Sequence, residues 1–227
     1  MLKILFKSLK DLFNKKIFFI SLIPVIVAAI FWGIVFFIFH NEITNLIISL
    51  VKHIPFVSDG GWIVTIVETI GGIFIYYELI ILTSIMLVGV VADKIVEEIN
   101  LKDYNLEQKG SSTITESIKI SLKQNIIFII LFIILLPTMF IPLLNILVNI
   151  ILWMILIKKP MFYDSITLIA TKDEFNKLES QDTFTTKLIT FLSVLLFLIP
   201  LFGVFVYIIQ LLIFIHFNLQ RLDKLRK

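Results

Sequence analysis

Hydrophobic residues are gathered into four long stretches of the chain, residues 17–39, 62–91, 125–157 and 188–217. Polar stretches separate them, and all 20 Lys and Arg residues lie in those polar stretches. A helix needs about 20 apolar residues to cross the ~30 Å hydrocarbon core of a bilayer. The first two stretches, of 23 and 30 residues, are therefore predicted to be transmembrane helices.

The third and fourth stretches are predicted to be helical hairpins. A straight helix of 33 residues would reach about 50 Å, whereas two full crossings with a turn would need more than about 40 residues. Both stretches are interrupted near their middles, by Pro137 and Pro142 in one and by Pro200 and Gly203 in the other. Proline removes a backbone donor and clashes with the preceding turn of a helix. We therefore expect two short arms in each, which enter and leave the membrane on the cytoplasmic side.

The polar stretches carry the signatures of shorter helices. Between 43 and 54 the apolar residues recur at spacings of three and four, which predicts an amphipathic helix on the outer interface. Pro55 and the turn at 58–61 are expected to end it. Apolar residues at 95, 96 and 99 extend the second span as a cytoplasmic amphipathic helix. Two capping boxes are also predicted, Thr113 with Glu116 and Thr171 with Glu174.

These elements predict the fold class. We expect an all-α integral membrane protein that forms a single membrane domain over residues 1–227. It has two transmembrane helices, two partly penetrating helical hairpins and amphipathic interfacial helices. An irregular turn at membrane depth must be covered by protein or line a wet cavity, so the hairpins favour a pore or an oligomer.

The two hairpin segments resemble each other. Residues 131–137 (LFIILLP) match 194–200 (VLLFLIP), and each closing proline is followed 21 positions later by a basic residue, Lys158 or Arg221. Paired interrupted segments are typical of substrate pathways in transporters. Apolar sequences also resemble one another by chance, so internal duplication and coincidence both remain open.

The distribution of basic residues predicts the topology. Five Lys lie in 1–16, five in 92–124 and five in 158–187, four Lys or Arg lie in 218–227, and only one Lys lies in 40–61. Basic loops stay in the cytoplasm, so both termini are expected there and 40–61 outside. Because the Lys and Arg residues flank the apolar segments, they are interpreted as topology signals. The net charge of +3 therefore does not indicate a nucleic-acid partner.

Composition and motifs exclude several classes of protein. The chain is 59% hydrophobic and 16% charged, which rules out a water-soluble globular domain. It contains no Cys, so disulfides and thiolate chemistry are excluded. No catalytic or phosphate-cradling motif is present, and we expect neither an enzyme nor a metal or cofactor. His40, His53 and His216 lack metal-ligand spacing and are expected at surface or interfacial positions.

Glu68 and Glu78 are the only charged residues inside the apolar segments. A charge in a span costs at least ~2.5 kcal/mol unless it finds a partner, water or a proton. Glu68 is close enough to the segment end to reach the outer headgroups. Glu78 is mid-span, and both a gating or proton-linked role and a structural hydrogen bond remain open for it.

Asn14, Lys15 and Lys16 precede the first span. A capping residue, two ammonium groups and the free N–H groups of a helix start together favour an oxyanion. The same lysines also suit simple anchoring of the topology, so both interpretations stand.

Four segments of the chain together resemble the CysZ-type sulfate permease family, also called the etoposide-induced protein family. Residues 14–18 (NKKIF) followed by Pro24 resemble the paired-basic start of its first helix. Residues 93–102 (DKIVEEINLK) are similar to its cytoplasmic continuation of the second span. Residues 162–164 (FYD) resemble its aromatic-aspartate signature, and 193–202 (SVLLFLIPLF) its Ile-Pro-Leu hairpin turn.

The resemblance implies an oligomeric permease or channel of the bacterial inner membrane, with two transmembrane helices and two partly penetrating hairpins, which admits sulfate or a similar oxyanion for cysteine synthesis. It implies that Lys15 and Lys16, beside Asn14, bind the oxyanion, although Arg is common at the paired positions. We assign Glu78, Glu98 and Lys102 to gating or the pore. The expected partners are the anion, the lipid bilayer and further copies of the chain. The alternative function is a non-transporting membrane scaffold that wedges one leaflet.

Overall fold

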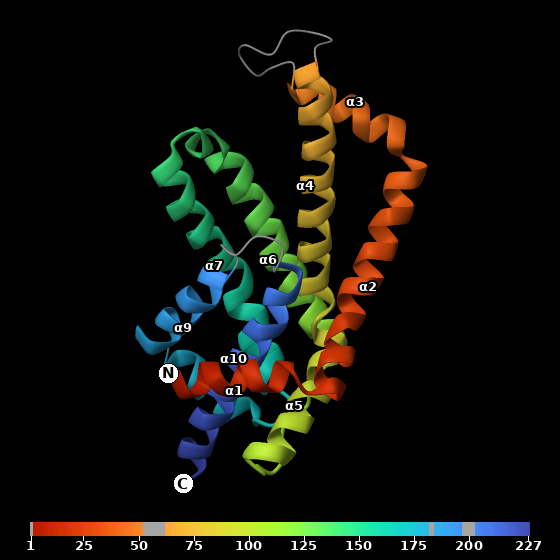
Figure 1. Ribbon diagram of the computed structural model, residues 1–227. Coiled ribbons are helices and arrows are strands. Elements are labelled where there is room, and N and C mark those ends of the chain that lie inside the picture. Colours follow the sequence, from red (N-terminus) through yellow and green to blue (C-terminus); the bar gives the residue numbers. More distant parts are fainter. Residues whose placement is uncertain (1, 52–61, 182–183, 197–202) are drawn as a thin grey trace. The chain divides into compact units, whose positions relative to one another are not determined.

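A computed structural model describes residues 2–51, 62–181, 184–196 and 203–227 of the 227-residue chain. Every regular element in these ranges is a helix, which confirms the predicted all-α class (Figure 1). In chain order they are α1 Leu2–Leu12, α2 Lys15–Ile38, α3 His40–Val51, α4 Trp62–Leu87, α5 Gly89–Asp103, α6 Ile114–Leu135, the 3₁₀ helix η1 Leu136–Phe140, α7 Pro142–Ile166, α8 Lys172–Ser180, α9 Phe184–Leu195 and α10 Gly203–Arg226.

Four of the described helical segments are long and apolar enough to cross a membrane: Lys15–Ile38, Thr69–Leu87, Ile114–Thr138 and Leu143–Ile166. The first two coincide with the predicted spans. The other two are the arms of the first hairpin. Between 22% and 39% of each apolar window is buried by the protein, so most of this apolar surface is available to lipid. The chain is a multi-pass membrane protein.

The first hairpin turns at its prolines. Helix α6 ends at Leu135, Pro137 lies in η1, and Pro142 is the first residue of α7. A proline at the first helical position lacks only an N–H that would have no partner inside the helix. The two arms pack against each other along their length (Figure 1). The depth to which the hairpin enters the membrane stays a prediction.

The two arms of this hairpin have 22 residues in α6 and 25 in α7, and together they extend beyond both ends of the apolar stretch 125–157. The expectation of two short arms is therefore wrong for this hairpin, because each arm is long enough to cross a membrane. The polar start of α6 continues the helix because one side of it is buried in the protein. Ser117, Ser121 and Gln124 on that side are each less than 5% exposed. Sequence hydropathy alone does not detect a helix that buries small polar residues.

The second predicted hairpin corresponds to α9 and α10, and Gly203 is the first residue of α10. The expected break at Pro200 lies outside the described residues. Helix α10 is mostly apolar, and every residue from Val206 to Leu219 except Ile209 is buried. It therefore serves as a core helix of the protein.

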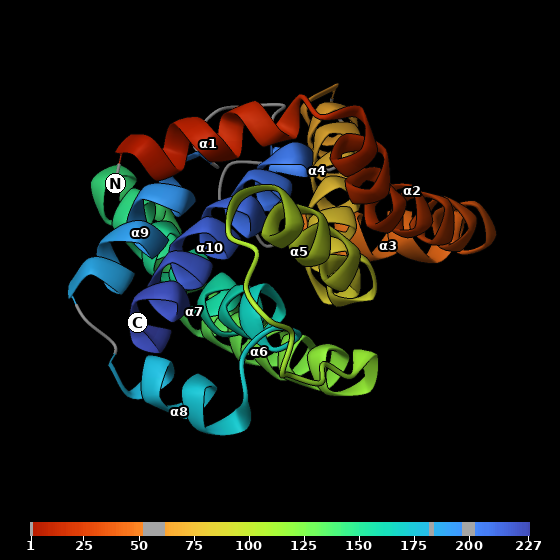
Figure 2. The same ribbon diagram turned by 90° about the horizontal axis from the view of Figure 1, so that it is seen from below.

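Two compact units make up the chain, one of residues 1–24 with 85–227 and the other of residues 25–84. In the first unit, α10 is the central helix and packs against α1, α5, α7, α8 and α9. Figure 2 shows α10 between α1 on one side and α7 on the other. The expectation of a single membrane domain stays a prediction.

The second unit pairs the C-terminal part of α2 with α4. The Tyr76 hydroxyl donates to the backbone oxygen of Ala29 at 3.0 Å, and the Trp32 indole donates to Thr83 Oγ1 at 2.8 Å. The rings of Phe36 and Tyr76 are in edge contact, 5.3 Å apart. Aromatic side chains with a polar handle thus hold two otherwise apolar helices in register.

The amphipathic linkers are helical, as predicted. Helix α3 covers residues 40–51, and the expected stop at Pro55 and 58–61 lies outside the described residues. On α5, Ile95, Val96 and Ile99 are fully buried. Helix α1 was not predicted, although it is strongly amphipathic. Phe6 within it and Phe13 just after its end are 70% and 83% exposed.

Only one of the two predicted capping boxes forms. Thr171 Oγ1 accepts from the backbone N–H of Glu174 at 3.3 Å, and the Glu174 carboxylate accepts from the N–H of Thr171 at 2.8 Å. Arg226 also donates two hydrogen bonds to Glu174, at 2.8 and 2.9 Å. These bonds lower the pKa of the Glu174 carboxyl to about 2. The prediction for Thr113 is wrong, because the Glu116 carboxylate accepts instead from the Tyr163 hydroxyl at 3.1 Å.

The expected cytoplasmic position of residues 158–187 can be tested with a single introduced cysteine, since the chain has none of its own. We expect Ser180→Cys, at an exposed position on α8, to react with a membrane-impermeant maleimide only after the cells are permeabilised. Glu42→Cys on α3, also exposed, is the matched control and should react in intact cells. Labelling of the Ser180→Cys variant in intact cells would contradict the hairpin topology.

Candidate functional site

The predicted oxyanion residues lie at the corner between α1 and α2. Asn14 Oδ1 accepts from the backbone N–H of Lys16 at 3.0 Å, and the Asn14 backbone oxygen accepts from the N–H of Phe18 at 2.9 Å. These two bonds make Asn14 the N-cap of α2, as expected from its residue type. The side chains of Lys15 and Lys16 are exposed. The corner therefore presents two ammonium groups at the start of the first span.

Lys16 and Glu98, two of the predicted site residues, form an ion pair between α2 and α5. The side chains of the two residues are 63% and 30% exposed. An exposed pair of this kind contributes roughly 0 to 1 kcal/mol, because water screens it and both side chains lose freedom. The Lys16 ammonium group that an oxyanion would need is thus already paired with the Glu98 carboxylate. This pairing is weak.

Lys102 lies one helical turn after Glu98, but its partner is Asp11 on α1. The hydrogen bond to the Asp11 carboxylate raises the pKa of the Lys102 ammonium above its ordinary value. Lys102 therefore bonds to a second group of side chains, which includes Asp11, and not to Lys16 or Glu98. Its predicted role in gating is not supported by a contact with the lysine corner.

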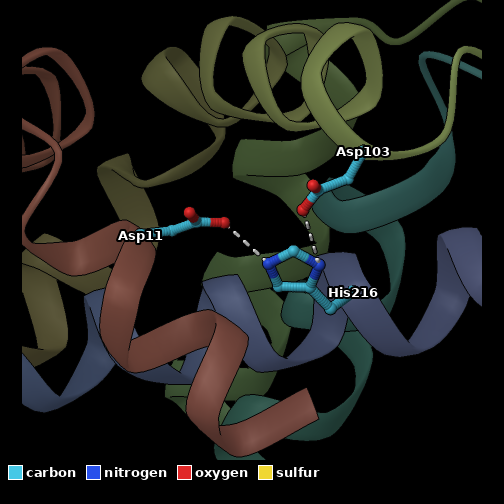
Figure 3. A group of neighbouring side chains, drawn as sticks. All are labelled: Asp11, Asp103 and His216. Carbon is cyan, nitrogen blue, oxygen red and sulfur yellow. Dashed lines mark hydrogen bonds and ion pairs between the residues drawn. The ribbon is translucent and has the colours of Figure 1, made fainter. Parts of the chain in front are cut away.

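The second group is a buried polar network around His216 (Figure 3). His216 is fully buried, and its Nε2 lies 2.8 Å from Asp11 Oδ2. Its Nδ1 lies 3.0 Å from the Tyr104 hydroxyl and 3.9 Å from Asp103 Oδ2. The network joins α1, α5 and α10. The expectation of a surface position for His216 is wrong, because Asp11, 205 residues away, gives the ring a buried partner.

Ligand-type atoms of Asp11, Asp103 and His216 lie within 4.8 Å of one another, a spacing that a metal ion could bridge. Each of these groups already has a protein partner, however. Lys102 binds the Asp11 carboxylate, and Lys7 Nζ lies 3.3 Å from Asp103 Oδ2. Two ammonium groups thus balance two carboxylates. The network is a structural joint between helices, and burial raises the pKa of the Tyr104 hydroxyl within it.

The other histidines and the intramembrane glutamates are placed as follows. His40 is exposed on α3, as expected, whereas His53 lies outside the described residues. Glu78 is half-buried on α4 in the second unit. Glu68 also belongs to α4, but its side chain is not among those described. Neither proposed role of Glu78 is decided by its position.

Comparison with known proteins identifies the family. A model of the family described as Sulfate transporter CysZ/Etoposide-induced protein 2.4 matches residues 4–207, from α1 into the first turns of α10. The chain belongs to this family. Searches of the curated proteins and of the solved structures found no match. The CysZ family is one of transporters, which agrees with the expectation that this protein is not an enzyme.

In this CysZ-family protein the aromatic-aspartate signature ends in a buried carboxylate. Asp164 is 3% exposed, and its Oδ1 accepts from the Ser117 hydroxyl at 2.6 Å. Its Oδ2 has no hydrogen-bond partner among the described residues. A Cβ on Gly89 would lie 1.8 Å from Ser117 Oγ and 3.2 Å from Asp164 Oδ1. The signature thus marks a point where α5, α6 and α7 approach one another closely.

Two features of the site were missing from the sequence-based prediction. The His216 network and the pairing of Lys16 with Glu98 both join residues more than 80 positions apart. The acidic residue in an otherwise basic α1, Asp11, was the available signal, since an acid on a buried helix face requires a cationic or donor partner. The position of Asp11 in the sequence could not identify which residue is its partner.

Proposed function

We propose that this CysZ-family protein is an oligomeric permease or channel that admits sulfate or a similar oxyanion into the cytoplasm for sulfur assimilation. The observation that supports it most is the exposed Lys15–Lys16 corner, capped by Asn14, in a chain of a sulfate transporter family. Two ammonium groups at a helix start attract and hold a divalent anion. In this proposal the lysines concentrate sulfate at the cytoplasmic mouth of the pathway.

Glu98 has a specific part in the proposed mechanism. Its carboxylate competes with the substrate for Lys16. An arriving sulfate exchanges with the carboxylate, and departure of sulfate restores the ion pair. Because the exposed pair is weak, this exchange costs little. Glu98 therefore acts as a gating group of the kind assigned from the sequence.

The alternative is a non-transporting membrane scaffold. The observation that favours it is the same ion pair, since Lys16 and Lys102 both have carboxylate partners within the protein. In that case Lys15 and Lys16 are topology anchors, and the hairpins serve to wedge one leaflet or to hold a partner.

Sulfate uptake by proteoliposomes separates the two functions. We expect purified protein to accelerate sulfate uptake over empty liposomes, and the Lys15→Gln, Lys16→Gln double variant to bind sulfate about tenfold more weakly, as loss of charge-assisted hydrogen bonds predicts. Glu98→Gln, which removes the competitor, should strengthen binding about twofold to fivefold. Isothermal titration measures both affinities.

Lys3→Gln with Lys10→Gln is the matched control, because both are exposed lysines of α1 and their loss removes the same two charges nearby. It should leave sulfate affinity within about twofold of the unmodified protein, as screening of exposed charges predicts. Equal sulfate affinities in the unmodified protein, the Lys15→Gln, Lys16→Gln variant, Glu98→Gln and the control, together with no sulfate uptake, would reject the permease and favour the scaffold. A strictly monomeric folded protein in nanodiscs would contradict the oligomer.

A further inference from the structure

A basic cavity of about 160 Å³ lies where α7, α8, α9 and α10 come together. Lys158 and Lys159 from α7 and Arg221 from α10 line it, and Glu179 of α8 is the one acidic residue among the lining residues described. Among the described lining residues, three cations and one carboxylate give a formal charge of +2. The cavity is several times larger than one water molecule, which takes up roughly 30 Å³ in the liquid. It can therefore admit a small anion.

Thr186 supplies a hydrogen-bond donor inside the cavity. Thr186 is one of the lining residues, it is 3% exposed, and among the residues described its hydroxyl has no hydrogen-bond partner. Buried hydroxyl groups in folded proteins nearly always have a partner. Thr186 also lies in the first turn of α9, which begins at Phe184, and a helix N-terminus favours negative charge. An acceptor atom in the cavity would satisfy the hydroxyl.

The guanidinium of Arg221 is held in place by the end of α8. Its Nη2 donates to the backbone oxygens of Leu178 at 2.9 Å and of Gln181 at 3.1 Å. The guanidinium also lies over the ring of Phe217, 5.2 Å from its centre. A guanidinium held in one position is better suited than a mobile ammonium group to bind two oxygens of a tetrahedral oxyanion at once. The Arg221 guanidinium is therefore held in the cavity wall by the protein itself, without a ligand.

The internal similarity of the two hairpins leads to the same cavity. Lys158 and Arg221 each follow a hairpin proline, Pro137 or Pro200, by 21 positions. Helices α7 and α10, which carry them, pack against each other. Equivalent positions of the two segments therefore contribute to one wall.

We propose that this cavity binds a tetrahedral oxyanion, either the phosphate of an anionic phospholipid or a free sulfate or phosphate. The ammonium groups and the guanidinium neutralise the charge, and the Thr186 hydroxyl donates to one oxygen. Lys158 and Lys159 directly follow the apolar stretch 125–157, which is where phospholipid headgroups meet a membrane helix. Phe162 and Leu178 provide an apolar wall beside the charged one. The site stands independently of sulfate transport.

The test uses full-length protein with Lys15→Gln and Lys16→Gln, so that the lysine corner cannot contribute. Sodium sulfate and sodium phosphate are titrated by calorimetry at constant ionic strength. Phosphatidylglycerol and phosphatidylcholine are titrated in detergent and counted by native mass spectrometry. The cavity variants are Lys158→Gln with Lys159→Gln, and Thr186→Val. Lys119→Gln with Lys123→Gln on α6 is the control, since it removes two exposed lysines and the same charge.

We expect the double lysine variant to lose about tenfold in affinity for the bound anion, and Thr186→Val about threefold or more, while the control stays within about twofold. Loss confined to phosphatidylglycerol identifies the lipid as the source, and loss confined to sulfate or phosphate identifies a free anion. The proposal is overturned if none of the four probes binds, or if cavity and control variants bind equally. Thr186→Val keeps size and charge, so it decides the question even where the lysine variant fails to fold.

Discussion

Replacing Asp11 with alanine is expected to destabilise the folded protein by about 2 to 3 kcal/mol, since its hydrogen bond to the buried imidazole is lost and an N–H of that ring is left without an acceptor. Asp11 is 2% exposed and binds both His216 and Lys102. Its loss leaves the buried imidazole without its acceptor. The side chain of Lys102 is 43% exposed and its ammonium returns to water at little cost, so the larger part of the effect comes from His216.

The measurement is the midpoint of thermal unfolding in detergent at a fixed scan rate, followed by circular dichroism. Lys10→Ala on the same helix is the control, because Lys10 is exposed and its loss should change the midpoint little. Asp11→Asn keeps an acceptor for the imidazole and should fall between the two. An unchanged midpoint in Asp11→Ala would mean that α1 is not held to α10 by this network.

Replacing Gly89 with alanine is the second large change. The added Cβ would lie 1.8 Å from Ser117 Oγ and 2.6 Å from Ser117 Cβ. Rotation of the serine side chain cannot remove the second clash, so α5 or α6 must shift. We expect a destabilisation of about 3 kcal/mol, at the upper end of the range for overpacked cores.

Ser117→Gly provides the matched test of this explanation, because it deletes both clashing atoms. It also removes the hydrogen bond to Asp164 and so lowers stability on its own account. In that background, adding Gly89→Ala should cost less than about 1 kcal/mol, which a double-mutant cycle on unfolding midpoints resolves. Equal costs of Gly89→Ala in both backgrounds would show that close approach to Ser117 is not the cause.

Local rules predicted the parts of the fold that depend on neighbours in the chain. Pro137 and Pro142 end one arm of the first hairpin and begin the next, and the Thr171 capping box uses residues three positions apart. The box at Thr113 has the same spacing but does not form. The Glu116 carboxylate instead accepts a hydrogen bond from the hydroxyl of Tyr163, which lies 47 residues after Glu116. A sequence pattern cannot show that a competing partner arrives from another helix.

The candidate site shows the same limit. Asn14 was predicted from a residue type and a position, and it caps α2. The Lys16–Glu98 pair joins two residues that the sequence had marked separately, 82 positions apart. His216 was expected at the surface because its ring lacked metal-ligand spacing, yet burial depends on Asp11 and Tyr104, which come from other parts of the chain. Pairings of this kind require the packing of the helices, which hydropathy does not determine.

The central position of α10 has a consequence for biogenesis. The ribosome makes α10 after α1, α5, α7, α8 and α9, the helices that pack around it. Until it emerges, Asp11 lacks His216 and Ser165 lacks Asn218, which otherwise donates to it at 2.7 Å. Contacts between segments this far apart in the chain form slowly. The earlier helices therefore complete these polar contacts only after α10 has been made, and an insertase or chaperone has most to protect before that point.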